Sequence, residues 1–133
     1  MPDMNVTAYT AAALAVILVA LALPISLRRQ KTKISLGSGD DSLLHVQVRA
    51  HGNFTEYAAF GLLMLALVEF NGASLWVLCT VATALVAGRL IHALGMFFSS
   101  IPLRGVGMIA TYFSILMAGW TLAVHAMNTP VSV

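Results

Sequence analysis

The sequence predicts an all-α integral membrane protein whose single domain, residues 1–133, is an up-and-down bundle of four transmembrane helices. Of the 133 residues, 59% are hydrophobic and 9% are charged, and the mean hydropathy is +0.90. Soluble domains carry far more charge than this. The apolar residues gather in four runs, each near or above the roughly 20 residues that cross a hydrocarbon core. Because lipid offers the backbone no hydrogen-bond partners, such runs form helices.

The expected helices follow these runs in order along the chain. The first covers about residues 6–27, is rich in alanine, leucine and valine, and contains no charged residue, with Pro24 and Arg28 marking its end. The second covers residues 42–70 and has polar residues in its first half, while the third and fourth cover about residues 73–98 and 105–127. Because the links between the runs are short, we expect consecutive helices to be antiparallel.

Positive charge marks the first and third connections between these helices. Residues 28–41 include four Arg or Lys residues, and the third connection ends at Arg104, whereas the second connection is uncharged. The positive-inside rule places the first and third connections in the cytoplasm, so both termini are expected on the outer face. The net charge of +2 is not spread as a nucleic-acid-binding patch would be, and we expect no nucleic-acid partner.

A polar stripe inside the second run is the best indication of function. Arg49, Asn53, Glu56 and Tyr57 follow one another at spacings of four, three and one, which places them on one side of a helix. Ionisable groups at membrane depth cost roughly 2.5–3.5 kcal/mol each on insertion scales. We therefore expect the stripe to face a partner, a cavity or a polar ligand.

The third run brings further polar groups to the same depth. Arg89 and His92 lie near its cytoplasmic end, and an antiparallel third helix would set them beside the stripe of the second helix. One interpretation is a structural ion pair between Glu56 and either Arg49 or Arg89. However, the cationic donors outnumber the single carboxylate, and this surplus favours an anionic or multiply polar ligand.

Other residues indicate structural roles rather than chemistry. Glu69 closes the outer end of the second run, where we expect it to reach water. Cys79 is the single cysteine, which excludes an internal disulfide, and the histidines lack the spacing of a metal site, so no metal is expected. Four glycines are expected to let helices approach closely: Gly88, Gly95, Gly105 and Gly107.

Two segments resemble one known family. The run RAHGNFTEY at residues 49–57 resembles the signature of the membrane-associated proteins in eicosanoid and glutathione metabolism, the MAPEG family, which includes microsomal glutathione transferases. The run GRLIHALG at residues 88–95 resembles the corresponding third-helix segment of that family. The likeness covers nearly the whole chain and is greatest to short bacterial inner-membrane members. It implies a MAPEG-like homotrimer in the inner membrane, where the outer face expected for both termini is the periplasmic one.

The resemblance also implies a ligand and its contacts. Glutathione is expected between neighbouring subunits near the cytoplasmic side. Its expected contacts are Arg49, His51, Asn53, Glu56, Tyr57, Arg89, His92 and either Arg28 or Arg29. Arg104 resembles the family arginine that stabilises the thiolate, and is the expected catalytic residue. His92 and Met96 occupy positions where the eicosanoid branch has tyrosines, which argues against a leukotriene synthase.

These observations predict a glutathione-dependent transferase or peroxidase that acts on lipophilic electrophiles. Its expected partners are glutathione as co-substrate, a lipophilic small molecule, membrane lipid and further copies of the chain. The alternative is a non-catalytic membrane protein of the same family that binds a lipid or glutathione. A small multidrug transporter is disfavoured, because such proteins carry a carboxylate in the first helix and this run has none.

Overall fold

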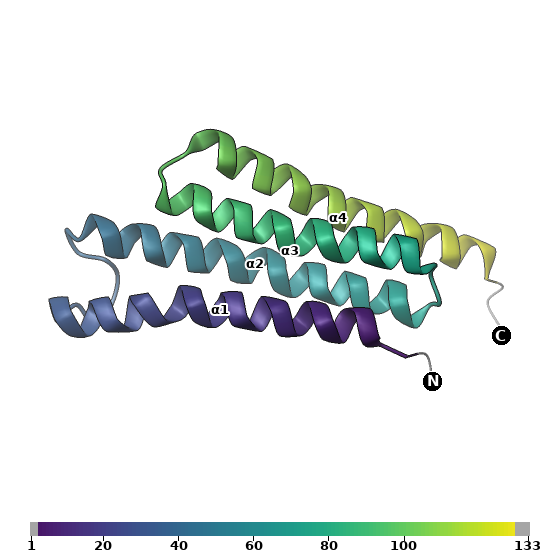
Figure 1. Ribbon diagram of the computed structural model, residues 1–133, viewed down its shortest axis with the longest axis horizontal. Coiled ribbons are helices and arrows are strands. Elements are labelled where there is room, and N and C mark those ends of the chain that lie inside the picture. The colour runs from purple at the N-terminus through teal and green to yellow at the C-terminus, as the bar shows by residue number, and fades with distance from the viewer. Residues whose placement is uncertain (1–2, 130–133) are drawn as a thin grey trace.

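Four long antiparallel helices make up the computed structural model, which describes residues 3–129. They are α1 (Asn5–Thr32), α2 (Ser42–Phe70), α3 (Leu75–Phe97) and α4 (Ile101–Asn128). Figure 1 shows them side by side, with the α1–α2 and α3–α4 links at one end of the bundle. All four are long and apolar enough to cross a membrane. The predicted all-helical architecture with four spans is therefore confirmed.

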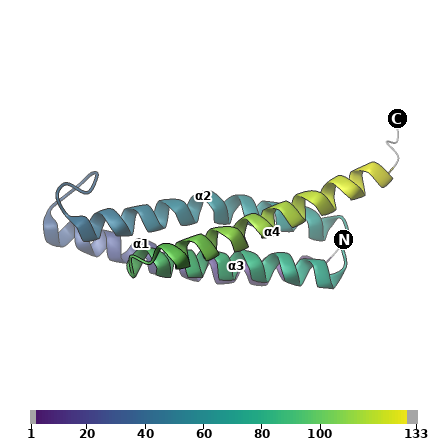
Figure 2. The ribbon, with the colours of Figure 1, turned by 90° about the horizontal axis from the view of Figure 1, so that it is seen from above.

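The helices do not contact one another equally. Within the described residues, α2 and α3 form the centre, while α1 packs on both of them and does not contact α4. Figure 2 shows α4 running obliquely across the other helices. As a result, one face of α2 is left open near the end where α4 begins.

Two helix ends differ from the sequence-based prediction. α1 continues past Pro24 and Arg28 to Thr32, five residues beyond the predicted end. Arg29 and Lys31 lie in its last turn, where positive charge complements the helix dipole. α4 begins at Ile101, four residues earlier than predicted, because Pro102 fits the first turn of a helix, where no backbone N–H is needed.

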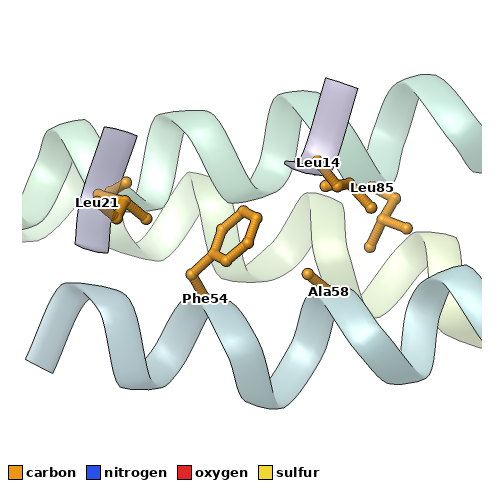
Figure 3. Packing of buried hydrophobic residues seen from close by; sticks show 6 residues of the cluster. Leu14, Leu21, Phe54, Ala58 and Leu85 are labelled. Atoms are coloured by element: carbon orange, nitrogen blue, oxygen red, sulfur yellow. The ribbon is translucent and has the colours of Figure 1, made fainter. Parts of the chain in front are cut away.

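The core consists of two apolar clusters along the bundle. The first joins α1, α2 and α3, and Figure 3 shows the Phe54 ring projecting from α2 between the positions of Leu14 and Leu21. The second joins α2, α3 and α4 nearer the other end of the bundle. It contains Leu65, Val68, Leu78, Val81, Ala82 and Ala118.

Backbone contact between α3 and α4 depends on glycine. A Cβ atom on Gly107 would lie 2.5 Å from the backbone nitrogen of His92 and 2.7 Å from the carbonyl oxygen of Gly88. A Cβ atom on Gly88 would likewise lie 2.7 Å from Oγ1 of Thr111. Gly105, in contrast, has open space where its Cβ would be, so the expected close approach there is wrong. The contact at Gly88 and Gly107 sets the polar residues of α3 directly against α4.

Polar contacts hold both ends of α1. The expectation that Glu69 reaches water is wrong, because its side chain is buried and accepts hydrogen bonds from the backbone N–H groups of Val6 and Thr7. At the other end of α1, Arg28 pairs with Asp41 just before α2. The least buried helix of the bundle is thus held to α2 at both of its ends.

Candidate functional site

A groove of about 630 Å³ opens between α2 and α4, with α3 behind it, at the end of the bundle that carries the α3–α4 link. It brings together residues from three helices that are far apart in the sequence. The lining residues are His45, Val46, Arg49, Asn53, His92, Met96, Ile101, Arg104, Gly105 and Met108. Four of the residues expected to bind glutathione or to act in catalysis therefore meet here, namely Arg49, Asn53, His92 and Arg104.

Behind the groove, Arg89 joins α2, α3 and α4 through a hydrogen-bond network. Its side chain is only 1% exposed. Nε donates to Oγ1 of Thr111 at 2.9 Å, and one terminal nitrogen donates to Oδ1 of Asn53 at 2.8 Å and to the Asn53 carbonyl oxygen at 3.3 Å. The other terminal nitrogen lies 3.2 Å from Sδ of Met108. The guanidinium thus finds neutral acceptors, and no carboxylate in the described range, residues 3–129, pairs with it.

Two tyrosines extend this network along the bundle. The Arg89 guanidinium carbon lies 5.1 Å from the centroid of the Tyr57 ring, within the range of a cation–π contact. The hydroxyl groups of Tyr57 and Tyr112 are 3.5 Å apart, and their ring centroids are 5.9 Å apart. Tyr57 therefore packs on Arg89 and is not among the residues that line the groove.

Arg104 and His92 line the side of the groove that lies opposite α2. A Cβ atom on Gly95 would lie 2.7 Å from the backbone nitrogen of Arg104, so the start of α4 packs closely on the end of α3. This packing brings a terminal nitrogen of Arg104 to 4.0 Å from Sδ of Met96. His92 is buried on α3 and lines the groove together with Arg104.

No carboxylate from residues 3–129 lines the groove. Its charged lining residues are Arg49 and Arg104, and its other polar groups are the Asn53 amide and two imidazoles. Guanidinium groups bind carboxylates in a bidentate manner, and hydrogen bonds to charged acceptors are the stronger ones. Chemically, the groove is suited to an acidic ligand.

Glu56 forms no ion pair with the part of its own chain that the structure describes. Both Glu56 and Arg49 are exposed on α2, and the one salt bridge among residues 3–129 joins Arg28 and Asp41. The interpretation of a structural pair between Glu56 and an arginine is therefore wrong for the single chain. His51 is half-buried on α2 and does not line the groove.

Arg28 and Arg29 lie away from the groove in this chain. The guanidinium of Arg28 makes two contacts with the Asp41 carboxylate, at 2.9 and 3.2 Å, and Arg29 donates to the carbonyl oxygen of Ile34 at 3.3 Å. Asp41 also accepts the backbone N–H of Leu44 and so caps α2. The Arg28 hydrogen bond, followed by that from Leu44, lowers the pKa of the Asp41 carboxyl below its ordinary value.

The sequence analysis missed the contribution of α4 beyond Arg104. Met108 lines the groove, Thr111 holds Arg89, and Tyr112 reaches Tyr57. The spacing of Arg104, Met108 and Thr111, four and then three, was a visible signal for one helical face. Nothing in that spacing indicated that the face would meet α2 as well as α3.

A metal site is not supported by the residues that the structure describes. No group of three or more His, Cys, Asp or Glu side chains in residues 3–129 is arranged to hold a metal ion. The groove itself is lined by two arginines, whose charge disfavours a cation.

Comparison with known proteins agrees with this architecture. The model of the MAPEG family matches residues 7–124. Inner membrane protein YecN of Escherichia coli strain K12 is 30% identical over 112 residues, which cover 84% of this chain and 86% of the relative. The protein of the same name from Escherichia coli strain O6:H1 gives the same values. No solved structure matches the chain.

Proposed function

Because the chain is an integral membrane protein that belongs to the MAPEG family, we propose that it binds glutathione in the α2–α4 groove and transfers it to lipophilic electrophiles. The observation that carries this proposal is a groove between candidate membrane spans that is lined by two arginines and an amide, with no carboxylate from residues 3–129. Glutathione has carboxylates, one of which can pair with Arg49, and a thiol that can lie beside Arg104. The apolar side chains of Ile101 and Met108 offer a surface for the second substrate.

Arg104 is the residue that we propose to activate the thiol. A cation beside sulfur lowers the pKa of a thiol and raises the fraction of nucleophilic thiolate. In conjugation, the sulfur forms a bond to the electrophilic carbon, the leaving group departs with its electron pair, and the thiol proton passes to water. With a lipid hydroperoxide, two glutathione molecules would give the alcohol, water and glutathione disulfide. His92, beside Arg104, is the second candidate for the thiol contact.

A homotrimer would complete the site. Arg49 and Glu56 are exposed on α2 inside the span, and a charged side chain facing lipid at that depth is unfavourable. We propose that neighbouring copies cover this face and that Glu56 binds the ammonium group of glutathione between subunits. The same assembly would lie in the inner membrane with the groove on the cytoplasmic side and both termini in the periplasm.

A non-catalytic binding protein is the second candidate function. It is favoured by one observation, that neither Tyr57 nor Tyr112 lines the groove, so no phenol stands beside the expected thiol position. Such a protein would bind glutathione without raising its thiolate fraction. Stopped-flow absorbance of the thiolate on mixing with glutathione separates the two functions.

The test compares the detergent-purified native protein with Arg104→Ala, using Lys31→Ala as a control for the loss of a cation outside the groove. Glutathione at 100 times its Kd should stabilise the native protein by about 2.7 kcal/mol. We expect Arg104→Ala to keep most of this stabilisation but to lose most conjugation of a model aryl halide. Undiminished turnover in Arg104→Ala would remove Arg104 from the mechanism. A native protein whose Tm does not respond to glutathione would overturn the proposed function.

A further inference from the structure

We infer that Arg89 is a positioning residue that holds the side-chain amide of Asn53 with its oxygen turned away from the groove. The amide then offers a ligand its N–H donors only. This inference rests on the proposed function, since the ligand in question is glutathione. It gives Arg89 a role at the groove without any contact between Arg89 and the ligand.

The orientation of the Asn53 amide follows from the chemistry of arginine. A guanidinium group has only donors, so the atom that faces it at hydrogen-bond distance must be an acceptor. A terminal nitrogen of Arg89 lies 2.8 Å from Oδ1 of Asn53 and 3.3 Å from its carbonyl oxygen. The reversed amide would set N–H groups against N–H groups, and a buried donor without an acceptor is costly.

Other contacts hold the guanidinium group of Arg89 in place, so it cannot turn away from the Asn53 side chain. Thr111 donates its hydroxyl hydrogen to the carbonyl oxygen of Gly107 at 2.8 Å, which leaves the hydroxyl oxygen to accept from Nε of Arg89 at 2.9 Å. Met108 contacts the second terminal nitrogen, and the Tyr57 ring covers the guanidinium. With 1% of its surface exposed, Arg89 acts on the groove through Asn53.

The consequence concerns which part of a ligand the groove accepts. In residues 3–129, Nδ2 of Asn53 has no hydrogen-bond partner, while Asn53 lines the groove together with Arg49 and Arg104. All three residues therefore present donors. The segment of glutathione beside Asn53 must be an acceptor, a carboxylate or a peptide carbonyl, and an N–H group of the ligand is excluded there.

Side-chain NMR tests whether the N–H groups of Asn53 meet the ligand in the groove. The chain has four asparagines, so labelling with ¹⁵N-asparagine gives four side-chain NH₂ signals, and the signal missing from Asn53→Asp belongs to Asn53. We expect saturating glutathione to shift this signal in the detergent-solubilised protein, while the signal of Asn71, whose NH₂ donates to Leu67 outside the groove, stays in place. An unmoved Asn53 signal in protein whose Tm rises with glutathione would overturn the inference and leave the proposed function standing. The absence of any rise in Tm overturns the proposed function instead.

The Asn53→Asp variant supplies a second, independent measurement. A carboxylate has the same shape and only acceptors, so it should pair with Arg89 and keep the ligand-free Tm at or above the native value, whereas Asn53→Leu should lower it. Asn53→Asp should nevertheless bind glutathione at least tenfold more weakly, because it offers no donor to the groove. A ligand-free Tm for Asn53→Asp as low as that of Asn53→Leu would contradict the contact with Arg89. Native affinity in Asn53→Asp would contradict the donor role.

Discussion

Oε2 of Glu69 lies 2.7 Å from the backbone nitrogen of Thr7, so a side chain in the last turn of α2 caps the first turn of α1. Oε1 of the same carboxylate accepts the backbone N–H of Val6 at 2.9 Å. The first N–H groups of a helix have no partner within the helix, and negative charge there is favourable. The side chain of Met4, the N-cap residue of α1, accepts no hydrogen bond from these N–H groups. The cap instead comes from a residue 62 positions further along the chain.

Substitution of Glu69 should therefore loosen α1. Glu69→Ala removes both acceptors and leaves two partly buried N–H groups unpaired, a loss of about 0.5–2 kcal/mol in the free energy of unfolding. Glu69→Gln keeps one acceptor and should lose less. Chemical unfolding in detergent measures both variants, with Asp40→Asn, a change at an exposed loop acid, as the control. Equal stability of Glu69→Ala and Asp40→Asn would show that the cap contributes nothing.

Acid should weaken the other attachment of α1, the pair between Arg28 and Asp41. The pKa of Asp41 lies below its ordinary value because of the Arg28 hydrogen bond and the Leu44 N–H. Its contribution to stability is complete above the unfolded-state pKa, about 3.9, and is lost as the pH falls through the lower folded-state pKa. Asp41→Asn can still cap α2 but has no charge to titrate. We expect its Tm to be lower than native at pH 7 and to fall less steeply below about pH 4.

The same experiment has a built-in control in the neighbouring loop acid. Asp40→Asn should keep the native dependence of Tm on pH, because no ion pair joins Asp40 to the part of the chain that the structure describes. If the curves of Tm against pH are parallel for Asp41→Asn and the native protein, the ion pair between Arg28 and Asp41 does not stabilise the fold.

Backbone contact between α3 and α4 predicts a strong difference between two glycines on one helix. Gly107→Ala would place a methyl group against the backbone of His92 and Gly88, and overpacking of this kind costs about 1–3 kcal/mol. Gly105→Ala meets nothing within 4 Å and should be neutral or stabilising by up to about 1 kcal/mol through helix propensity. Unfolding in detergent measures both. Similar stabilities for the two variants would refute a close α3–α4 contact at Gly107.

Most of the fold could be predicted from the sequence because lipid leaves a long apolar run few alternatives to a helix. The ends were harder to predict. Pro24 and Arg28 suggested that the first helix stops early, yet α1 continues to Thr32, where Lys33 adopts a left-handed conformation with a φ of 56°. The cap from Glu69 could not be predicted either, since it depends on which end of α1 lies beside the last turn of α2.

Helical spacing predicts which residues of the site share a helix face and a depth, and this part of the site could be predicted. Arg49 and Asn53 lie one turn apart on one face of α2, and an antiparallel α3 brings His92 to the same depth, as the groove shows. Spacing alone could not reveal that Arg89 turns away from the groove towards Thr111. That outcome depends on the glycine contact between α3 and α4, which is a property of tertiary packing.

Labelling with a membrane-impermeant maleimide would test the proposed orientation. The variants carry a cysteine at Leu36, which is 86% exposed in the α1–α2 link, or at Asp3, exposed before α1, each combined with Cys79→Ala to remove the single native cysteine. Positive charge around Arg28 predicts that the link lies in the cytoplasm. In intact spheroplasts, we expect Asp3→Cys to react and Leu36→Cys to react only after the membrane is opened. The groove lies at the same end of the bundle as this link, so the reverse labelling pattern would place it on the periplasmic face, away from cytoplasmic glutathione.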